Sequence, residues 1–325
     1  MPPRALLITG AAGYIGRQLV TALASDRRGL DVVVATDVRE VPASERPAGI
    51  EYRTADIRDA GLVDLLQTYR IDTVAHLAAI VTPRKGDSPE LLYSVDVLGT
   101  ENVLAACLAA GVRQLVVTSS GAAYGYHADN PSPLRETDAL RGNDAFAYSR
   151  HKRLVEELLA RHRREHPELG QLIFRPGAIL GDAVSNQITD LFEKPVLLGV
   201  RGADSPYVFI WDQDVVACII KGIREERTGI YNLAGDGVMT VKDLARYTGK
   251  RYVALPSFLI RGALRLLQPL GLSQYGPEQV DFLRYRPVLS NEKLKSEFGY
   301  VPRLTTREVF ERYWRSRHGE RPEPR

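Results

Sequence analysis

Short apolar runs alternate with amphipathic segments through the first half of the chain. The first run, residues 4–9, is followed within a few residues by Ile15, Leu19, Val20 and Leu23 at helical spacing. Similar apolar runs occupy residues 32–36, 73–79, 112–118 and 172–174, and residues 51–53 are expected to form a further short strand. Strands that repeatedly give way to helices predict a doubly wound parallel sheet with helices on both faces, an α/β (Rossmann) fold. Ligands of such a sheet bind at the carboxyl ends of its strands.

A glycine cluster separates the first apolar run from its helix. We expect Gly10 to adopt the turn, Gly13 to let the backbone approach a pyrophosphate, and Gly16 to let the helix pack closely on the strand. Free N–H groups at the start of the helix suit a dianion. The spacing differs from the common G-x-G-x-x-G fingerprint, so a simple tight turn is the alternative. The expected dinucleotide cradle comprises Gly10, Ala12, Gly13, Tyr14, Ile15 and Gly16.

The pattern loosens beyond residue 175 into short pieces punctuated by glycine and proline, with isolated helices. Apolar runs at 207–211 and 229–233 predict further strands, and we expect the second to return to the main sheet. The chain is longer than a usual domain of about 100 to 200 residues. We therefore expect a dinucleotide-binding domain of residues 1–175 plus about 207–235, and a smaller substrate-binding region of residues 176–206 and 236–325.

An acidic residue, Asp37, ends the second predicted strand 21 residues beyond Gly16. In a dinucleotide fold, an acid at this place hydrogen-bonds the adenosine ribose. Because a carboxylate repels a 2'-phosphate, the sequence favours NAD over NADP. Arg39 could instead receive that phosphate, and a solvated loop acid is the structural alternative for Asp37.

The next two strands end in further candidate cofactor contacts. Asp56 and Ile57 follow the third strand, where an acid can meet the adenine amino group or cap a helix. The fourth strand ends in Leu77, Ala78 and Ala79, where small residues leave room for a flat ligand. His76 lies within that apolar strand, so we interpret it as a satisfied core histidine. Residues 91–110, which end at Gly111, predict the next helix.

Composition narrows the class of protein. With 43 basic and 40 acidic side chains the net charge is only +3, and no basic face with interleaved aromatic residues argues for nucleic acid. Hydrophobic residues make up 44% of the chain, enough for a large core. The two cysteines, Cys107 and Cys218, lie in apolar helical contexts and predict buried free thiols in a reducing cytoplasm. We expect no metal site.

Membrane spanning is not expected, because no run of about 18 residues lacks charges. The nearest candidate, residues 255–272, is interrupted by Arg261 and Arg265. We favour an amphipathic helix packed over a substrate pocket, with a helix on a membrane surface as the alternative.

A tyrosine and a lysine open a strongly amphipathic helix after the fifth strand. Tyr148 and Lys152 are separated by four positions and therefore share one face of that helix. Ser120 follows directly on the fifth strand, and Arg175 and Pro176 on the sixth. The carboxyl ends of these strands meet at the edge where a ligand is expected.

The ordered set of motifs resembles the extended short-chain dehydrogenase/reductase family, also called the NAD-dependent epimerase/dehydratase family. The resemblance covers most of the chain. It rests on residues 9–16, 76–79 and 119–125, on Tyr148 with Lys152, on Arg175-Pro176, and on the C-terminal segments 291–294 and 298–302.

This resemblance implies a hydride-transfer site. Tyr148 would be the acid/base, Lys152 would stabilise its phenolate and grip the nicotinamide ribose, and Ser120 would hold the substrate oxygen. A cation is needed because an ordinary tyrosine, with a pKa near about 10, transfers protons poorly at neutral pH. The implied cofactor contacts include Asp37, Asp56, Ile57, Leu77, Ala78, Ala79, Tyr148, Lys152, Arg175 and Pro176.

Departures from the family pattern bear on the substrate. The acidic pair of the dehydratases is replaced by Ser120-Gly121, which argues against a sugar dehydratase. Where nucleotide-sugar epimerases usually have a diphosphate-binding Asn and Arg, this chain has Gly177-Ala178 and Ser205-Pro206. Asn186 could substitute for one of them, whereas Arg201 is near but not in register. Asp96 stands where the family usually has Asn, with no clear meaning from the sequence.

Three functions remain open from the sequence. The leading interpretation is an NAD-preferring oxidoreductase acting on a secondary alcohol or ketone, because residues 255–272 favour a less charged small-molecule substrate. The second is a nucleotide-sugar 4-epimerase that keeps its NAD bound. The third is a non-catalytic dinucleotide-binding protein, which would not need Ser120, Tyr148 and Lys152 together. The family resemblance also implies a homodimer.

Overall fold

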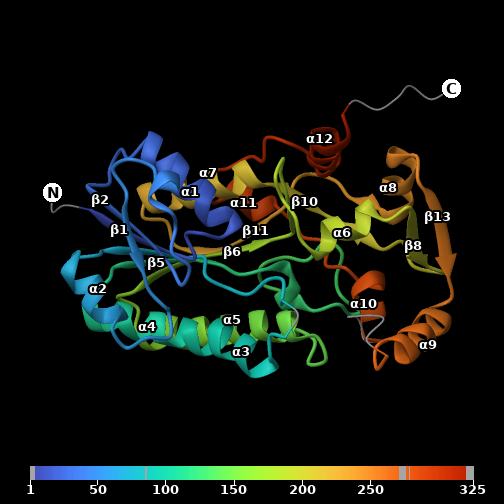
Figure 1. Ribbon diagram of the computed structural model, residues 1–325, viewed down its shortest axis with the longest axis horizontal. Coiled ribbons are helices and arrows are strands. Elements are labelled where there is room, and N and C mark those ends of the chain that lie inside the picture. The colour runs from blue at the N-terminus through green and yellow to red at the C-terminus, as the bar shows by residue number, and fades with distance from the viewer. Residues whose placement is uncertain (1–3, 85, 271–275, 278, 320–325) are drawn as a thin grey trace. The chain divides into compact units, whose positions relative to one another are not determined.

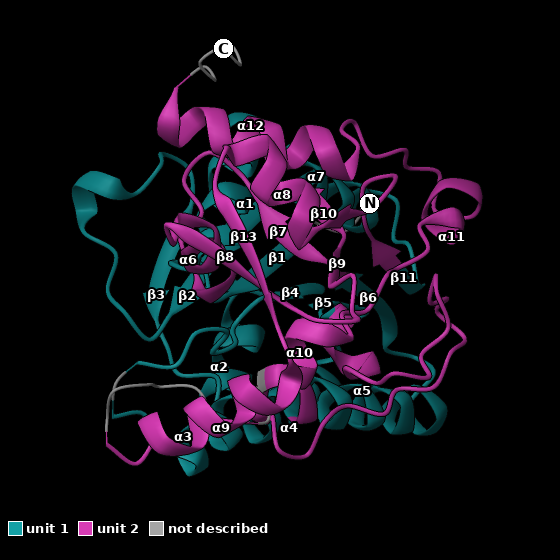
Figure 2. Cartoon of the chain, turned by 90° about the vertical axis from the view of Figure 1, so that its right-hand side faces the viewer, with its two compact units in different colours: residues 1–120, 151–175, 212–231 teal, residues 121–150, 176–211, 232–325 magenta. Residues whose placement is uncertain are grey.

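The computed structural model describes residues 4–84, 86–270, 276–277 and 279–319. It divides into two compact units, coloured teal and magenta in Figure 2. The first unit consists of residues 1–120, 151–175 and 212–231, and the second of residues 121–150, 176–211 and 232–325. Residues 121–150 and 207–211, which we expected in the dinucleotide-binding domain, thus cluster with the second unit.

A seven-stranded sheet forms the centre of the first unit, in the order β11-β6-β5-β4-β1-β2-β3. Strand β1 pairs in parallel with both β2 and β4, so the strand order reverses there. The carboxyl ends of β1 and β4 therefore flank the switch point at which doubly wound sheets bind ligands. The strands are β1 Ala5–Thr9, β2 Val32–Asp37, β3 Glu51–Thr54, β4 Thr73–His76, β5 Gln114–Thr118, β6 Gly170–Pro176 and β11 Gly229–Leu233.

Helices cover both faces of this sheet. Figure 1 shows α1 and α7 on one face and α2, α4 and α5 on the other. Because helices cover both faces, the side chains of β1 and the central side chains of β5 are buried on both sides of the sheet, and these strands are correspondingly apolar. The helical elements are α1 Tyr14–Ser25, η1 Ala43–Glu45, α2 Leu62–Thr68, α3 Pro89–Tyr93, η2 Ser94–Leu98, α4 Gly99–Ala110, α5 Ala147–Glu165 and α7 Asp212–Arg224.

One helical run, residues 89–110, is the single described helix long and apolar enough to cross a membrane. Half of its most apolar window is buried. Val103, Leu104 and Cys107 lie in the hydrophobic core of the first unit. We therefore interpret this run as a core helix of the sheet.

The second unit is built from short elements around an aromatic core. The rings of Phe192, Phe209 and Phe310 lie with centroids 5.3 to 5.9 Å apart. Three two-stranded sheets, β10-β7, β12-β9 and β13-β8, flank this core. The elements are η3 Gly121–Tyr124, β7 Ala178–Leu180, α6 Gln187–Glu193, β8 Val196–Val200, β9 Pro206–Tyr207, β10 Phe209–Trp211, β12 Met239–Thr240, α8 Val241–Thr248, β13 Arg251–Leu255, α9 Ser257–Leu267, α10 Gln279–Arg284, α11 Glu292–Ser296 and α12 Thr306–His318.

Several sequence predictions can be compared directly with these elements. The doubly wound sheet is confirmed, and residues 229–233 do return to it as β11 beside β6. Both cysteines are buried and free, and burial raises the pKa of the Cys107 thiol to about 12. Residues 207–211 instead pair with β12 and β7. Helix α9 has no buried residue, and its packing over a substrate pocket stays a prediction. Residues 271 and 272 of that expected segment lie outside the described part of the chain.

Candidate active site

In the glycine turn after β1, neighbouring backbone atoms leave no room for a side chain at two positions. Gly10 has a φ of +70°, and a Cβ there would stand 2.6 Å from the backbone nitrogen of Ala78. A Cβ on Gly16 would stand 2.2 Å from the carbonyl oxygen of Gly10. At Gly13 the nearest atom is that same oxygen, at 3.0 Å, so this position faces more open space. The turn brings the chain after β1 and after β4 together, as a dinucleotide cradle requires.

Helix α1 begins at Tyr14 without a side-chain cap. The first N–H groups of any helix lack partners within the helix, so this start can bind a pyrophosphate. The hydroxyl of Tyr14 donates to Asp212 of α7 at 2.5 Å, which fixes the ring beside the turn. Ala12 is buried and Ile15 half-buried at the same turn.

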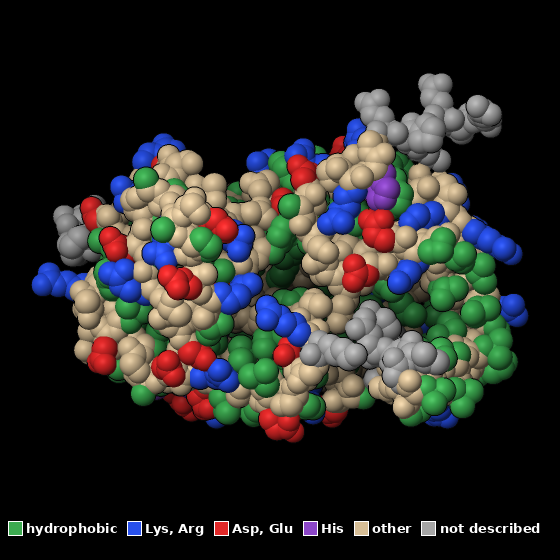
Figure 3. Space-filling view, viewed as in Figure 1, with side chains coloured by type: hydrophobic (Ala, Val, Ile, Leu, Met, Phe, Trp, Pro, Cys, Tyr) green, Lys and Arg blue, Asp and Glu red, His purple; other side chains and the backbone are tan. Residues whose placement is uncertain are grey.

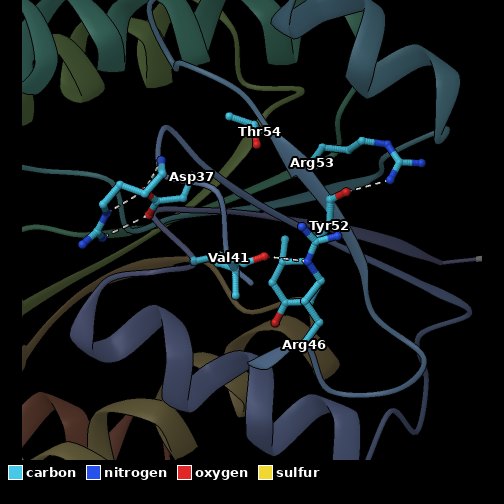
Figure 4. Close-up of a pocket in the computed structure, with 9 residues that line it drawn as sticks. Asp37, Val41, Arg46, Tyr52, Arg53 and Thr54 are labelled. Atoms are coloured by element: carbon cyan, nitrogen blue, oxygen red, sulfur yellow. Dashed lines mark hydrogen bonds and ion pairs between the residues drawn. The ribbon is translucent and has the colours of Figure 1, made fainter. Parts of the chain in front are cut away.

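Asp37 at the end of β2 connects this turn to a small pocket. Its Oδ2 accepts from the Ala12 amide at 3.0 Å, and its Oδ1 accepts from the Arg39 amide and Nε, both at 3.0 Å. Figure 4 shows the pocket, which is lined by Asp37 and by three arginines, Arg39, Arg46 and Arg53. The predicted role of Asp37 as the ribose-binding acid fits this placement.

The segment after β4 forms the other side of the switch point. The Leu77 amide donates to the Thr9 carbonyl at 3.2 Å, and the Ala78 amide lies 3.4 Å from the Thr9 hydroxyl. His76 is buried between two hydroxyls, with Nδ1 2.8 Å from Thr9 Oγ1 and Nε2 3.1 Å from Thr100 Oγ1. Burial, with a smaller effect of the Lys152 charge, lowers the pKa of His76 to about 3. The prediction of a satisfied core histidine is confirmed.

Asp56 and Ile57 follow β3, and their local contacts are structural. The Asp56 carboxylate accepts from Arg58 Nη2 at 2.5 Å and from the Arg58 amide at 2.9 Å; these bonds hold the Asp56 pKa below its usual value. Ile57 is buried, and its carbonyl accepts from Asn102 at 2.7 Å. Their contact with an adenine ring stays a prediction.

Lys152 lies on α5, with its ammonium group against the end of β5. Lys152 is buried, and its Nζ donates to the Thr118 carbonyl at 3.2 Å. Ser120, two residues beyond Thr118, is half-buried. Both predicted groups therefore lie at the carboxyl end of β5. Tyr148 is in the first turn of α5, and the helix places it one turn before Lys152.

A buried acid–histidine pair lies next to this lysine. His151 Nδ1 and Asp96 Oδ2 are 3.0 Å apart, and Asp96 Oδ1 accepts from the Ile80 amide at 2.9 Å. Because an ionised carboxylate can only accept, we assign the hydrogen of the His151 ring to Nδ1, which then donates to Asp96. The pair joins the segment after β4 to helix α5. The unusual Asp96 thus has a structural partner that sequence reasoning did not find.

Arg175, at the end of β6, forms an ion pair with Glu156 of α5. Its Nη2 and Nε donate to Glu156 at 2.6 and 2.8 Å, and Ser119 Oγ donates to Glu156 Oε1 at 2.6 Å. All three side chains are buried. This network fixes α5 against the ends of β5 and β6, while a contact of Arg175 or of the buried Pro176 with cofactor stays a prediction.

Tyr148 lies among aromatic side chains of the second unit. Phe146 is 6.3 Å from the Tyr148 ring, and Tyr126 and Phe282 are 5.7 and 5.6 Å from Phe146, measured between ring centroids. Ser149 Oγ donates to the Ala122 carbonyl at 2.7 Å and anchors the start of α5.

One cation adjoins this aromatic group. The Arg286 guanidinium stacks on Tyr207 and Phe282, 4.0 Å from each ring centre. Its Nε and Nη2 are buried, and neither has a hydrogen-bond partner among the described residues. Sequence reasoning missed Arg286, as it missed Glu156, because neither belongs to a spaced motif.

Residues 6–234 match the model of the NAD-dependent epimerase/dehydratase family. A UDP-glucose 4-epimerase of Mycolicibacterium smegmatis is 34% identical over 72% of this chain and 78% of its own length. Sterol demethylase protein B of Methylococcus capsulatus is 29% identical over 94% and 95%. The solved structure of MoeE5 with UDP-glucuronic acid and NAD has a TM-score of 0.71 at 25% identity, covering 96% of this chain and 98% of that protein.

Proposed function

The chain belongs to the NAD-dependent epimerase/dehydratase family, and on that premise we propose that it is an oxidoreductase acting on a secondary alcohol or ketone. The observation that carries the proposal is the pairing of Tyr148 with Lys152 on α5, where Lys152 Nζ is fixed by the Thr118 carbonyl. A buried ammonium held one turn from a tyrosine stabilises its phenolate form. A pure binding protein has no need of that arrangement.

The residues present fit the family's cofactor. NAD, when bound, supplies or accepts the hydride. The glycine turn and the uncapped start of α1 would hold its pyrophosphate, and Asp37 its adenosine ribose. We assign the nicotinamide ribose hydroxyls to Lys152.

Proton movement is assigned to this chain's own side chains. On reduction, the Tyr148 hydroxyl gives its proton to the substrate carbonyl oxygen; on oxidation, the phenolate takes the proton from the alcohol. Ser120 donates a hydrogen bond that positions the same oxygen. The ammonium group of Lys152 compensates the charge of the phenolate.

Two observations support a substrate without a diphosphate. A Cβ on Gly177 would stand 2.8 Å from the Val208 carbonyl oxygen, so the side chain of an amide donor does not fit there. Ser205, where epimerases usually have Arg, is buried. Around Tyr148 the second unit presents the rings of Phe146, Tyr126 and Phe282, which suit an apolar molecule.

A nucleotide-sugar 4-epimerase is the second candidate, and Arg286 favours it. Arg286 is half-buried, and a guanidinium whose buried Nε and Nη2 lack partners among the described residues can receive a phosphate. The 34% identity to a UDP-glucose 4-epimerase supports the same activity. In that reaction the hydride leaves and returns to one sugar carbon, so no net NADH forms.

Purified protein with NAD should separate these candidates. Stoichiometric NADH from a panel of cyclic and sterol alcohols, with none from UDP-glucose, supports the oxidoreductase. UDP-galactose from UDP-glucose without net NADH, lost in Arg286→Met, would establish the epimerase instead. In either case Tyr148→Phe should lower kcat by about 10² to 10⁴-fold. Tyr69→Phe, at the end of α2, is the matched control and should keep full activity. A Tyr148→Phe variant with the kcat of wild type would overturn the assignment of Tyr148 as the acid/base.

A further inference from the structure

Helix α9 of the second unit turns an apolar face outward. Phe258 and Leu266 are 70% and 71% exposed, Leu259 is 50% exposed, and Leu270 just beyond the helix is 70% exposed. Figure 3 shows hydrophobic side chains on the lower right of the surface, where Figure 1 places α9. Isolated exposed leucines are ordinary, but a group of this kind on one helix marks an interaction surface.

The polar residues of α9 form a separate stripe. At 100° per residue, Ser257, Arg261 and Arg265 follow one another along one side of the helix. On the same wheel Phe258 borders Arg265, and Gly262, Leu266, Leu259 and Ala263 follow in that order around the exposed side of the helix. Apart from Arg265 at its edge, the exposed side of α9 therefore carries only apolar side chains and a glycine.

The stretch of sequence that contains α9 carries basic but no acidic side chains. The sequence contains no acidic residue between Asp243 and Glu278, while Arg246, Lys250, Arg251, Arg261 and Arg265 fall within that interval. Arg261 is held by Asp281, 2.7 Å away, whereas Arg265 is exposed. An apolar helix face bordered by arginine is complementary to anionic headgroups above acyl chains.

A second copy of the chain is a poorer occupant of this face. Eleven residues make a helix of about 16 Å, and a face about 10 Å wide gives an area well below the roughly 800 Å² per partner of a stable interface. A symmetric contact through α9 would also bring the basic stripes of both copies together. A bilayer needs no such area, because each inserted side chain leaves water independently.

We propose that α9, with Leu270, docks the protein on an anionic lipid surface by inserting Phe258, Leu259 and Leu266 between headgroups. Arg265 then lies at headgroup level. Docking is peripheral and parallel to the membrane plane, and it does not depend on the activity proposed above. If that activity holds, the site would work on alcohols or ketones dissolved in the bilayer.

Sedimentation with vesicles tests the proposal on the full chain. Wild-type protein should bind vesicles of phosphatidylglycerol and phosphatidylcholine in equal parts, and more weakly at 0.5 M than at 0.1 M NaCl. The double variant Phe258→Asp, Leu266→Asp should lose at least tenfold in partition coefficient. Arg265→Glu should weaken binding to these anionic vesicles but should not weaken binding to vesicles of phosphatidylcholine alone. Val301→Asp, at another exposed apolar residue of the second unit, is the matched control and should bind like wild type.

Other outcomes overturn the proposal. Wild-type protein that stays in the supernatant with anionic vesicles excludes lipid docking, as does a Val301→Asp variant that loses as much binding as the double variant. If ultracentrifugation shows a dimer that Phe258→Asp, Leu266→Asp converts to monomer, the face is an interface between copies. Thermal unfolding followed by circular dichroism shows that the variants are folded, which is expected because the replaced side chains are exposed.

Discussion

Asp96 and His151 form a buried pair, with 3.0 Å between carboxylate Oδ2 and ring Nδ1, directly beside the lysine of α5. The other carboxylate oxygen accepts the Ile80 amide. One side chain thus connects the chain after β4 with the helix that carries Tyr148 and Lys152. An asparagine could accept from Ile80 equally well, but it would require His151 to carry its hydrogen on the other nitrogen.

Two replacements of Asp96 should therefore lower the free energy of unfolding by different amounts. Asp96→Ala leaves the Ile80 amide and His151 Nδ1 buried without acceptors, and should lower the free energy of unfolding by about 2 to 4 kcal/mol. Asp96→Asn should cost about half as much, because its amide can replace both bonds. Urea unfolding monitored by fluorescence provides the comparison. Equal losses in the two variants would show that the bonds do not stabilise the fold.

Alanine substitutions at two glycines of the opening turn should have different effects, one on the stability of the fold and the other on cofactor binding. Gly16→Ala places a Cβ 2.2 Å from the Gly10 carbonyl and should destabilise the protein by more than about 3 kcal/mol. Gly13→Ala meets only one atom, at 3.0 Å, so we expect a small change in stability but at least about tenfold weaker NADH binding. Fluorescence titration and thermal unfolding measure the two effects. Gly61→Ala, with open space around its Cβ, is the control.

Cofactor choice should depend on the charge of Asp37. Asp37→Asn retains an acceptor for the Ala12 amide but removes the negative charge among Arg39, Arg46 and Arg53. We expect the ratio of NADPH to NADH dissociation constants to fall by about tenfold, because a 2'-phosphate is no longer repelled. Glu51→Gln removes the same charge from exposed β3 and should leave the ratio unchanged. If both variants behave alike, the effect is one of general charge.

His76 should make the protein sensitive to mild acid. Its pKa is about 3 in the folded chain, below its ordinary value of 6.5, so the unfolded chain binds the proton first. This contribution to stability is complete above pH 6.5 and is lost as the pH falls from 6.5 toward 3, by at most about 1.4 kcal/mol per pH unit. His76→Gln should flatten the dependence between pH 6 and 4, as measured by urea unfolding. A slope identical to wild type would contradict a buried neutral His76.

Periodicity and turn chemistry were sufficient to predict the sheet and its glycine turn. The prediction that residues 229–233 return to the main sheet is confirmed, because they form β11 beside β6. The φ of +70° at Gly10 confirms the predicted turn conformation, and the 2.2 Å between a Cβ on Gly16 and the Gly10 carbonyl oxygen confirms the predicted close packing.

What the sequence did not reveal depends on contacts between distant segments. Residues 121–150 have no hydrophobic period, and they are held by single bonds such as Tyr124 Oη to Asn232 at 2.9 Å. The Glu156–Arg175 pair joins a helix to a strand, so no local spacing indicates it. The sequence of α9 predicts an amphipathic helix but does not indicate which of its apolar side chains are exposed.

The position of β11 governs how the sheet can be completed during synthesis. Strand β6 pairs on one side with β5, but its other neighbour is not translated until residues 229–233 have been made. A polypeptide stopped at residue 211 would carry β6 as an open edge and would lack α7, which covers one face of the sheet. Such a fragment should self-associate through that edge, so the cofactor-binding half of this enzyme cannot be isolated by trimming the C-terminus.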